Sequence, residues 1–235
     1  QHVADHAGLQ DIALGDPVAE HESTTLGEYF IRTAAYNDAL VSKHSVFIGR
    51  KGTGKSASMY QLAEEIGRDS RNHVCVIKPV AYEVEEILQL LNEISASSEQ
   101  GYVLESLWKF LIYTELAKSL YEHLSSKPLY YEQSSSEKEL FAFVKEHWGL
   151  ILSDFSVRLE QAVLKLHGLD KTSSVQNQRL KISELLHEDL LPTLRALLGK
   201  VLSSKHKTVV LIDNLDKAWE PKSDPQALSA FIFGL

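Results

Sequence analysis

The sequence predicts an α/β protein in which a mainly parallel sheet is interrupted by a large helical segment. An apolar run at 45–49 passes through a glycine-rich loop into a helical pattern over Ser56–Gly67. Two further runs of apolar and β-branched residues, 72–79 and 208–212, lack clean alternation, as expected for parallel strands covered on both faces. The interval 83–207 shows helical periodicity instead. These observations together indicate a β-α-β start, a helical insertion and a returning strand.

The glycine-rich loop is the first chemical element. Its fixed positions in the pattern G-x-x-x-x-G-K-[ST] are filled by Gly49, Gly54, Lys55 and Ser56. Between a strand and a helix, this pattern is typical of a P-loop, or Walker A motif, whose backbone N–H groups and helix dipole cradle phosphates. Lys55 would reach the β- and γ-phosphates, and the Ser56 hydroxyl would bind Mg²⁺. We therefore predict a nucleotide site formed by Gly49, Arg50, Lys51, Gly52, Thr53, Gly54, Lys55, Ser56 and Ala57.

The second chemical element is the run 208–216, in which a β-type stretch ends in aspartate. Catalytic groups of an open parallel sheet project from the carboxyl ends of strands, which is where both Asp213 and the loop are expected. Asp213 is predicted to hold Mg²⁺ beside Ser56, as a Walker B carboxylate does. Asp216 would orient or deprotonate the attacking water. Lys55, Asp213 and Asp216 are the predicted catalytic residues.

The spacing of the two motifs predicts the domain organisation. We expect a polar arm over 1–23, the first part of a P-loop NTPase core over 24–82, a helical insertion over 83–207, and the Walker B strand with its following segment over 208–235. A nucleotide-binding sheet usually has about five strands, and the sequence provides three candidates. The expectation is therefore an incomplete NTPase domain.

Helical signals in the insertion are specific enough to test. One apolar stripe runs from Val103 to Leu124, and Ser134-x-x-Glu137 has the form of a capping box that opens a helix ending near Trp148. Further helices are expected over 151–167 and 179–202. Trp108 and Trp148 are interpreted as core residues. Ahead of the loop, a helix is expected after Thr25, with Phe30 and Thr33 among its inner residues.

Composition limits the function classes. The net charge is −8, which does not support a broadly basic nucleic-acid surface, although a local basic patch is compatible with that total. Cys75 is the one cysteine, so an internal disulfide and a cysteine-based zinc site are excluded. The sequence has neither an apolar run long enough for a membrane helix nor a secretory signal pattern. We expect a cytoplasmic protein without a membrane partner.

The loop Phe47-Ile48-Gly49-Arg50-Lys51-Gly52-Thr53-Gly54-Lys55-Ser56-Ala57, paired with Asp213-Asn214-Leu215-Asp216-Lys217, resembles bacterial P-loop ATPases related to the KAP and STAND branches of the AAA-like NTPases. The resemblance spans about residues 24–220. It implies Mg²⁺-dependent ATP binding and hydrolysis, used as a conformational switch or an assembly clock. Several such proteins act in phage defence or DNA-linked processes, often with an effector partner. Relatives often carry D-D-L-D or D-G-L-D, so Asn214 in this chain favours Asp216 as the residue that activates water.

Alternatives remain beside the ATPase hypothesis. The chain lacks an N-K-x-D base-reading motif, which favours ATP over GTP. Tyr29, Phe30 and Tyr36 are weak candidates for adenine contacts. A nucleotide-gated interaction module with little hydrolysis is the second hypothesis, and a small-molecule phosphotransferase is the third. A homo-oligomer or an effector protein is the expected protein partner; a sensor residue or arginine finger would come from beyond Leu235 or from that partner.

Overall fold

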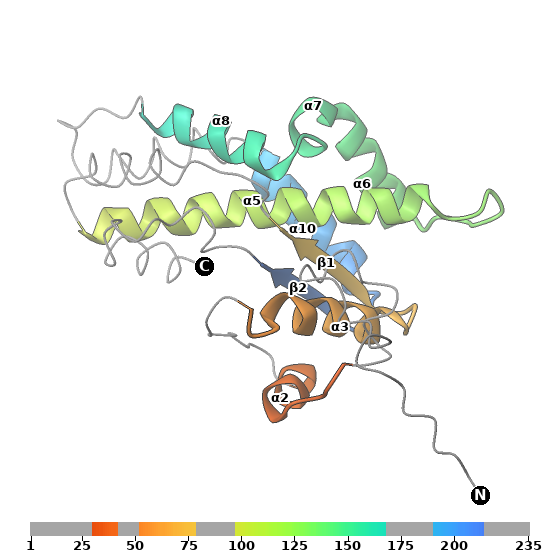
Figure 1. Cartoon of the computed structure of the whole chain (residues 1–235). Coiled ribbons are helices and arrows are strands. Elements are labelled where there is room, and N and C mark those ends of the chain that lie inside the picture. The colour runs from red at the N-terminus through yellow and green to blue at the C-terminus, as the bar shows by residue number, and fades with distance from the viewer. Residues whose placement is uncertain (1–29, 42–51, 79–96, 168–189, 214–235) are drawn as a thin grey trace, which may run out of the picture. The chain divides into compact units, whose positions relative to one another are not determined.

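The computed structural model describes residues 30–41, 52–78, 97–167 and 190–213. Within these residues the chain forms seven helices and a two-stranded parallel sheet, so the predicted α/β class is confirmed at this level (Figure 1). The chain divides into two compact units, Gln1–Asp69 and Ser70–Leu235. None of the described helices combines the length and apolar character that crossing a bilayer requires.

The first unit contains helices α2 (Ala34–Val41) and α3 (Lys55–Gly67), which pack against each other. Tyr36 of α2 is fully buried and its hydroxyl donates a hydrogen bond of 2.7 Å to Oε2 of Glu65 in α3. Arg32 forms an ion pair of 2.9 Å with the same carboxylate. Glu65 therefore joins the segment before α2 to α3.

Helix α2 begins later than the sequence suggested. Phe30 to Thr33 are not helical, which corrects the prediction that Phe30 and Thr33 lie inside the helix. Thr33 Oγ1 accepts a hydrogen bond of 3.2 Å from the backbone N–H of Tyr36, and Thr33 O accepts one of 3.1 Å from Asn37 N. Threonine in this position caps a helix and sets its first turn.

The sheet belongs to the second unit. Strand β1 (His73–Ile77) pairs in parallel with β2 (Thr208–Ile212), with Cys75 opposite Val210. The predicted strands at 72–79 and 208–212 are therefore present and neighbouring. The ladder continues for one residue past β2, because Asp213 N donates a hydrogen bond of 3.0 Å to Ile77 O.

Helix α5 (Ser97–Ser125) organises the second unit. It contacts β1, α6 (Ser135–Glu146), α7 (Trp148–Ile151), α8 (Phe155–His167) and α10 (Leu190–Leu202). Adjacent residues such as Phe110 and Leu111 are both buried on it, so its buried side chains are not confined to one narrow stripe. The core cluster of buried residues lies entirely in this unit.

The capping box at α6 is confirmed. Glu137 N donates a hydrogen bond of 3.2 Å to Ser134 Oγ, and Ser134 N donates one of 2.8 Å to Glu137 Oε2. Trp108 is 2% exposed and is a core residue as predicted, whereas Trp148 is 54% exposed and is not. Trp148 opens the single-turn helix α7, where the chain changes direction between α6 and α8, and its ring meets that of Tyr121 edge-on.

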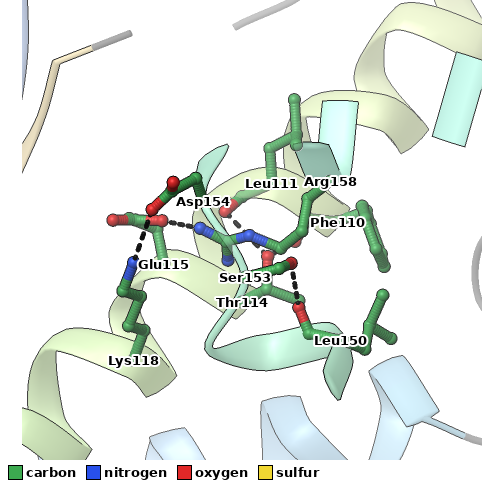
Figure 2. Close-up of polar contacts among 9 residues, drawn as sticks. All are labelled: Phe110, Leu111, Thr114, Glu115, Lys118, Leu150, Ser153, Asp154 and Arg158. Carbon is green, nitrogen blue, oxygen red and sulfur yellow. Dashed lines mark hydrogen bonds and ion pairs between the residues drawn. The ribbon is translucent and has the colours of Figure 1, made fainter. Parts of the chain in front are cut away.

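A buried ion pair joins α5 to α8. Arg158 of α8 is 0% exposed and its Nη2 donates to Glu115 of α5, as Figure 2 shows. Lys118 Nζ lies 3.8 Å from Asp154, so a second pair bridges α5 and the residue before α8. Among the described residues, Arg158 Nε and Nη1 have no hydrogen-bond partner. Burial lowers the pKa of Arg158 to about 10.

Candidate nucleotide-binding site

The described part of the predicted phosphate-binding loop consists of Gly52, Thr53 and Gly54, followed directly by α3. Both glycines have positive φ, 83° for Gly52 and 79° for Gly54. A side chain at either position would meet no atom within 4 Å, so glycine is required for backbone conformation rather than for space. Two left-handed residues separated by Thr53 therefore shape the chain directly before α3.

Gly54 is the residue at which α3 begins. It adopts the left-handed conformation at the N-cap position, and its carbonyl accepts a hydrogen bond of 2.9 Å from Ser58 N. Ser, Thr, Asp and Asn are favoured at this position because their side chains accept hydrogen bonds from the first turn, and glycine is also common there. Glycine has no such side chain. An anion at this helix end would meet the first-turn N–H groups and the positive end of the helix dipole.

Lys55 and Ser56 occupy the first turn of α3, and both side chains are half-buried. The structure thus brings the described candidates Gly52, Thr53, Gly54, Lys55, Ser56 and Ala57 together in one loop and one helical turn. Gly49, Arg50 and Lys51 lie outside the described residues, as does the predicted strand 45–49.

Asp213 follows β2 at the carboxyl end of the parallel pair, in the second unit. Its backbone N–H is held by Ile77 O, which fixes the residue at the strand end where the sequence predicted a carboxylate. Lys55 and Ser56 belong to the first unit. Asn214 and Asp216 lie outside the described residues.

The chemistry of single residues can be compared with what a magnesium ion requires: Ser56 in the first unit and Asp213 in the second each offer an oxygen group. Mg²⁺ prefers oxygen ligands and keeps several waters, so it is commonly held by one or two protein groups together with substrate phosphates. A hydroxyl at Ser56 and a carboxylate at Asp213 have that chemistry. Among the described residues, no three side chains of His, Cys, Asp or Glu gather to hold a metal by themselves.

Tyr36 does not offer a platform for adenine. Its ring is 0% exposed and Phe30 packs edge-on against it, with ring centroids 4.9 Å apart. Burial, followed by the hydrogen bond to Glu65, raises the pKa of its phenol. The weak prediction of an adenine contact at Tyr36 is wrong, because the ring is buried in the contact between α2 and α3. Tyr29 lies outside the described residues.

Two clusters in the second unit were missed by sequence reasoning. One is the buried Arg158 with Glu115. The sequence pattern that could have revealed it is an arginine on the apolar face of a helix, next to Leu159 and one turn before Ala162. The other surrounds His73, whose Nε2 lies 3.2 Å from Ser119 Oγ and whose ring lies 5.9 Å from that of His123. No sequence spacing connects these residues, because β1 and α5 meet only in the folded chain.

Comparisons with known proteins give one informative likeness. The chain is 27% identical over 216 residues to a protein of Escherichia coli strain K12 described as "Putative transposon gamma-delta 80.3 kDa protein". The match covers 88% of this chain and 28% of that protein, so the chain spans little more than a quarter of its length. No protein-family model matches the chain. No solved structure matches it either.

Proposed function

We propose that this chain binds Mg·ATP through the loop 49–57 and hydrolyses it, as a P-loop ATPase similar to the KAP and STAND branches. The observation that carries the proposal is Gly54, a left-handed glycine that begins a helix directly at Lys55 and Ser56 within a complete G-x-x-x-x-G-K-[ST] pattern. A lysine, a hydroxyl and open helix-start geometry at one point are the combination that binds a triphosphate.

Each proposed role follows from charge and position. Lys55 neutralises the β- and γ-phosphates, and Ser56 supplies one oxygen to Mg²⁺. Asp213 supplies the carboxylate on the metal side, which its place directly after β2 supports. Asp216 orients or deprotonates the water that attacks the γ-phosphate. Asn214 cannot take this proton because it is an amide.

The biological setting is proposed from the relative rather than from the site. The matched protein is described as a transposon protein, which favours a DNA-linked process over a metabolic one. The nucleotide cycle would act there as a conformational or assembly switch, with an effector or a second copy as protein partner. Phage defence, which the family resemblance implies, is a related setting.

A nucleotide-gated interaction module is the second candidate. It is favoured by apolar side chains that the segment between β1 and β2 exposes, such as Leu129 in the turn after α5 and Leu164 in α8. In that case ATP would control assembly and turnover would be slow or absent. The small-molecule phosphotransferase has no such observation in its favour.

The binding test uses a fluorescent ATP analogue and Lys55→Ala. We expect Lys55→Ala to lose most of the affinity, because the triphosphate loses its point-charge partner. Lys145→Ala, which removes an exposed lysine from α6, is the matched control and should bind as the unmodified chain does. Full ATP binding by Lys55→Ala would overturn the proposal.

Phosphate release then separates the two candidates. Asp216→Asn should bind ATP and hydrolyse it slowly, whereas Asp213→Asn should lose the Mg²⁺ dependence of binding. Unchanged turnover in Asp216→Asn would remove that residue from its role. Tight ATP binding by the complete protein, with no turnover in the presence of DNA and partner candidates, would favour the gated module.

A further inference from the structure

The amino-terminal ends of β1 and β2 gather arginine, lysine and histidine side chains in a chain that is acidic as a whole. Arg71 precedes β1, and Lys205, His206 and Lys207 precede β2. Backbone hydrogen bonds join the two segments, from His206 N to Arg71 O at 3.0 Å and from His73 N to Lys207 O at 2.8 Å. This end of the sheet is opposite to the end that carries Asp213. We call Arg71, Lys127, Lys205, His206 and Lys207 the strand-start cluster.

Lys127 reaches this cluster from the end of α5. His123 lies one helical turn before it, and its ring packs at 5.9 Å from the ring of His73 at the start of β1. Burial lowers the pKa of His123, and the positive charges of Lys127 and Lys205 lower it further. The His73–His123 contact brings the end of α5 to the start of β1, and Lys127 N, which donates a hydrogen bond of 3.3 Å to Leu124 O, continues the chain directly from that helix end.

The turn from α5 to α6, which contains Lys127, presents an exposed aromatic ring. Figure 1 shows it projecting past the end of α5. Tyr130 is 87% exposed at this turn, and Leu129 is fully exposed. Tyr131 is held instead: its hydroxyl donates to Glu137 at 3.1 Å, and Lys127 Nζ lies 5.6 Å from its ring centroid. Tyr131 N also donates to Pro128 O at 2.9 Å, which closes the turn.

These contacts fix the turn. The ring of Tyr131 is held in place, and the ring of Tyr130 is exposed to solvent. An exposed tyrosine is a stacking surface for a base, and base stacking is tolerant of sequence because every base has a flat face. The neighbouring cations suit the phosphates that link successive bases. An acidic peptide would use the charges without needing the ring, so the combination fits a nucleic acid with unpaired bases better.

We propose that the strand-start cluster and Tyr130 form a binding surface for single-stranded nucleic acid. Lys127 and Lys205 contact phosphates, and Tyr130 stacks on a base. Glu122 and Glu132 lie near the same turn in sequence and are exposed, so they disfavour a close-packed polyanion and limit the contact to a short stretch of strand. The surface requires no nucleotide at the 49–57 loop.

The experiment measures fluorescence anisotropy of a labelled oligothymidine with the complete chain, in the absence of ATP. Tyr130→Ala should weaken binding by roughly 5- to 150-fold, the effect of losing one stacked base. The double variant Lys127→Glu/Lys205→Glu should weaken binding further. It should also make the slope of log affinity against log salt concentration shallower, by about 0.7 for each lost phosphate contact.

Two matched controls keep the result specific. Trp148→Ala removes a half-exposed aromatic ring elsewhere on the unit, and Lys165→Glu reverses the charge of an exposed lysine on α8. Both should retain binding. Equal loss in the controls, or unaffected binding in Tyr130→Ala, would overturn the proposal. Binding to vesicles of anionic lipid but not to oligothymidine, with loss in the same variants, would assign the surface to a membrane and also overturn it.

Discussion

At the scale of single residues, Gly54 shows how a backbone conformation can be tested separately from side-chain space. It is left-handed at the start of α3, and a Cβ there would meet nothing within 4 Å. We expect Gly54→Ala to lower the free energy of unfolding by about 1 to 2 kcal/mol, because a residue with a Cβ is less stable by that amount in the left-handed region. It should also weaken ATP-analogue binding. Urea unfolding and analogue titration measure the two effects.

Gly67 is the matched control for Gly54. It closes α3 without a positive φ, and a Cβ there also meets nothing within 4 Å. Gly67→Ala should be neutral or stabilise the chain by about 0.5 to 1 kcal/mol, because alanine favours the helix. Equal destabilisation by the two substitutions would show that the left-handed conformation of Gly54 is not the cause.

His73 gives the chain a predictable dependence on pH. It is 4% exposed, and burial, followed by the charges of His123 and Lys205, lowers its pKa from 6.5 to about 4. Between these two values the unfolded chain binds the proton and the folded chain does not, so this residue reduces stability as pH falls through that window. Lowering the pH from about 7 to about 5 should remove roughly 2 kcal/mol through His73.

His73→Gln is the variant that isolates this effect. Glutamine retains a group that can hydrogen-bond with Ser119 but does not titrate. Urea unfolding of both proteins at the two pH values should show a smaller loss in the variant, by about the same 2 kcal/mol. A pH dependence identical in both proteins would place its origin in other groups, with His123 the first to examine because its pKa is also lowered.

At the scale of elements, the ion pair of Arg158 with Glu115 joins α8 to α5, and breaking it is expected to lower the free energy of unfolding more than the other changes that we propose. Glu115→Gln leaves the Arg158 charge buried without its partner and should cost about 3 to 5 kcal/mol. Arg158→Met should cost less, because Glu115 is 16% exposed and can still reach water. Replacing both residues by Met should cost less than the sum of the two single changes.

The surface pair Glu105 and Lys109 on the same helix is the control for that cycle. Both side chains are about half exposed. Glu105→Gln should change stability by no more than about 0.5 kcal/mol, because solvent screens exposed pairs. Urea unfolding monitored by helical circular dichroism gives all the values. A cost for Glu115→Gln as small as that for Glu105→Gln would contradict the interpretation of Arg158 as a buried charge dependent on one carboxylate.

The elements also show what sequence could and could not predict. Local signals worked where the cause is local: Ser134 with Glu137 predicted a helix start, and the pattern after the glycine-rich loop predicted the helix that ends at Gly67. Parallel pairing of 73–77 with 208–212 followed from apolar runs typical of buried strands. Trp148 was misassigned because apolar spacing does not show where a helix ends. Arg158 and His73 could not be predicted, since their partners are decided by packing.

At the scale of the whole molecule, the core cluster belongs to one unit. Its buried side chains run from Cys75 to Val201, all within Ser70–Leu235. The described residues of the first unit bury four apolar side chains, namely Tyr36, Met59, Leu62 and Ile66. Because apolar burial is the main source of stability, we expect residues 70–235 to fold as an independent cooperative unit.

The thiol of Cys75 can test that prediction without an added probe. It lies in β1 at 1% exposure, and burial raises the pKa of its thiol from 9.0 to about 11. Since thiolate is the reactive form, the thiol of the folded fragment 70–235 should resist a disulfide reagent and react quickly in urea. The complete chain, which has no other cysteine, is the control. A fragment that is helical by circular dichroism but whose thiol reacts as fast as in urea would have secondary structure without the core, and the second unit would then depend on the first.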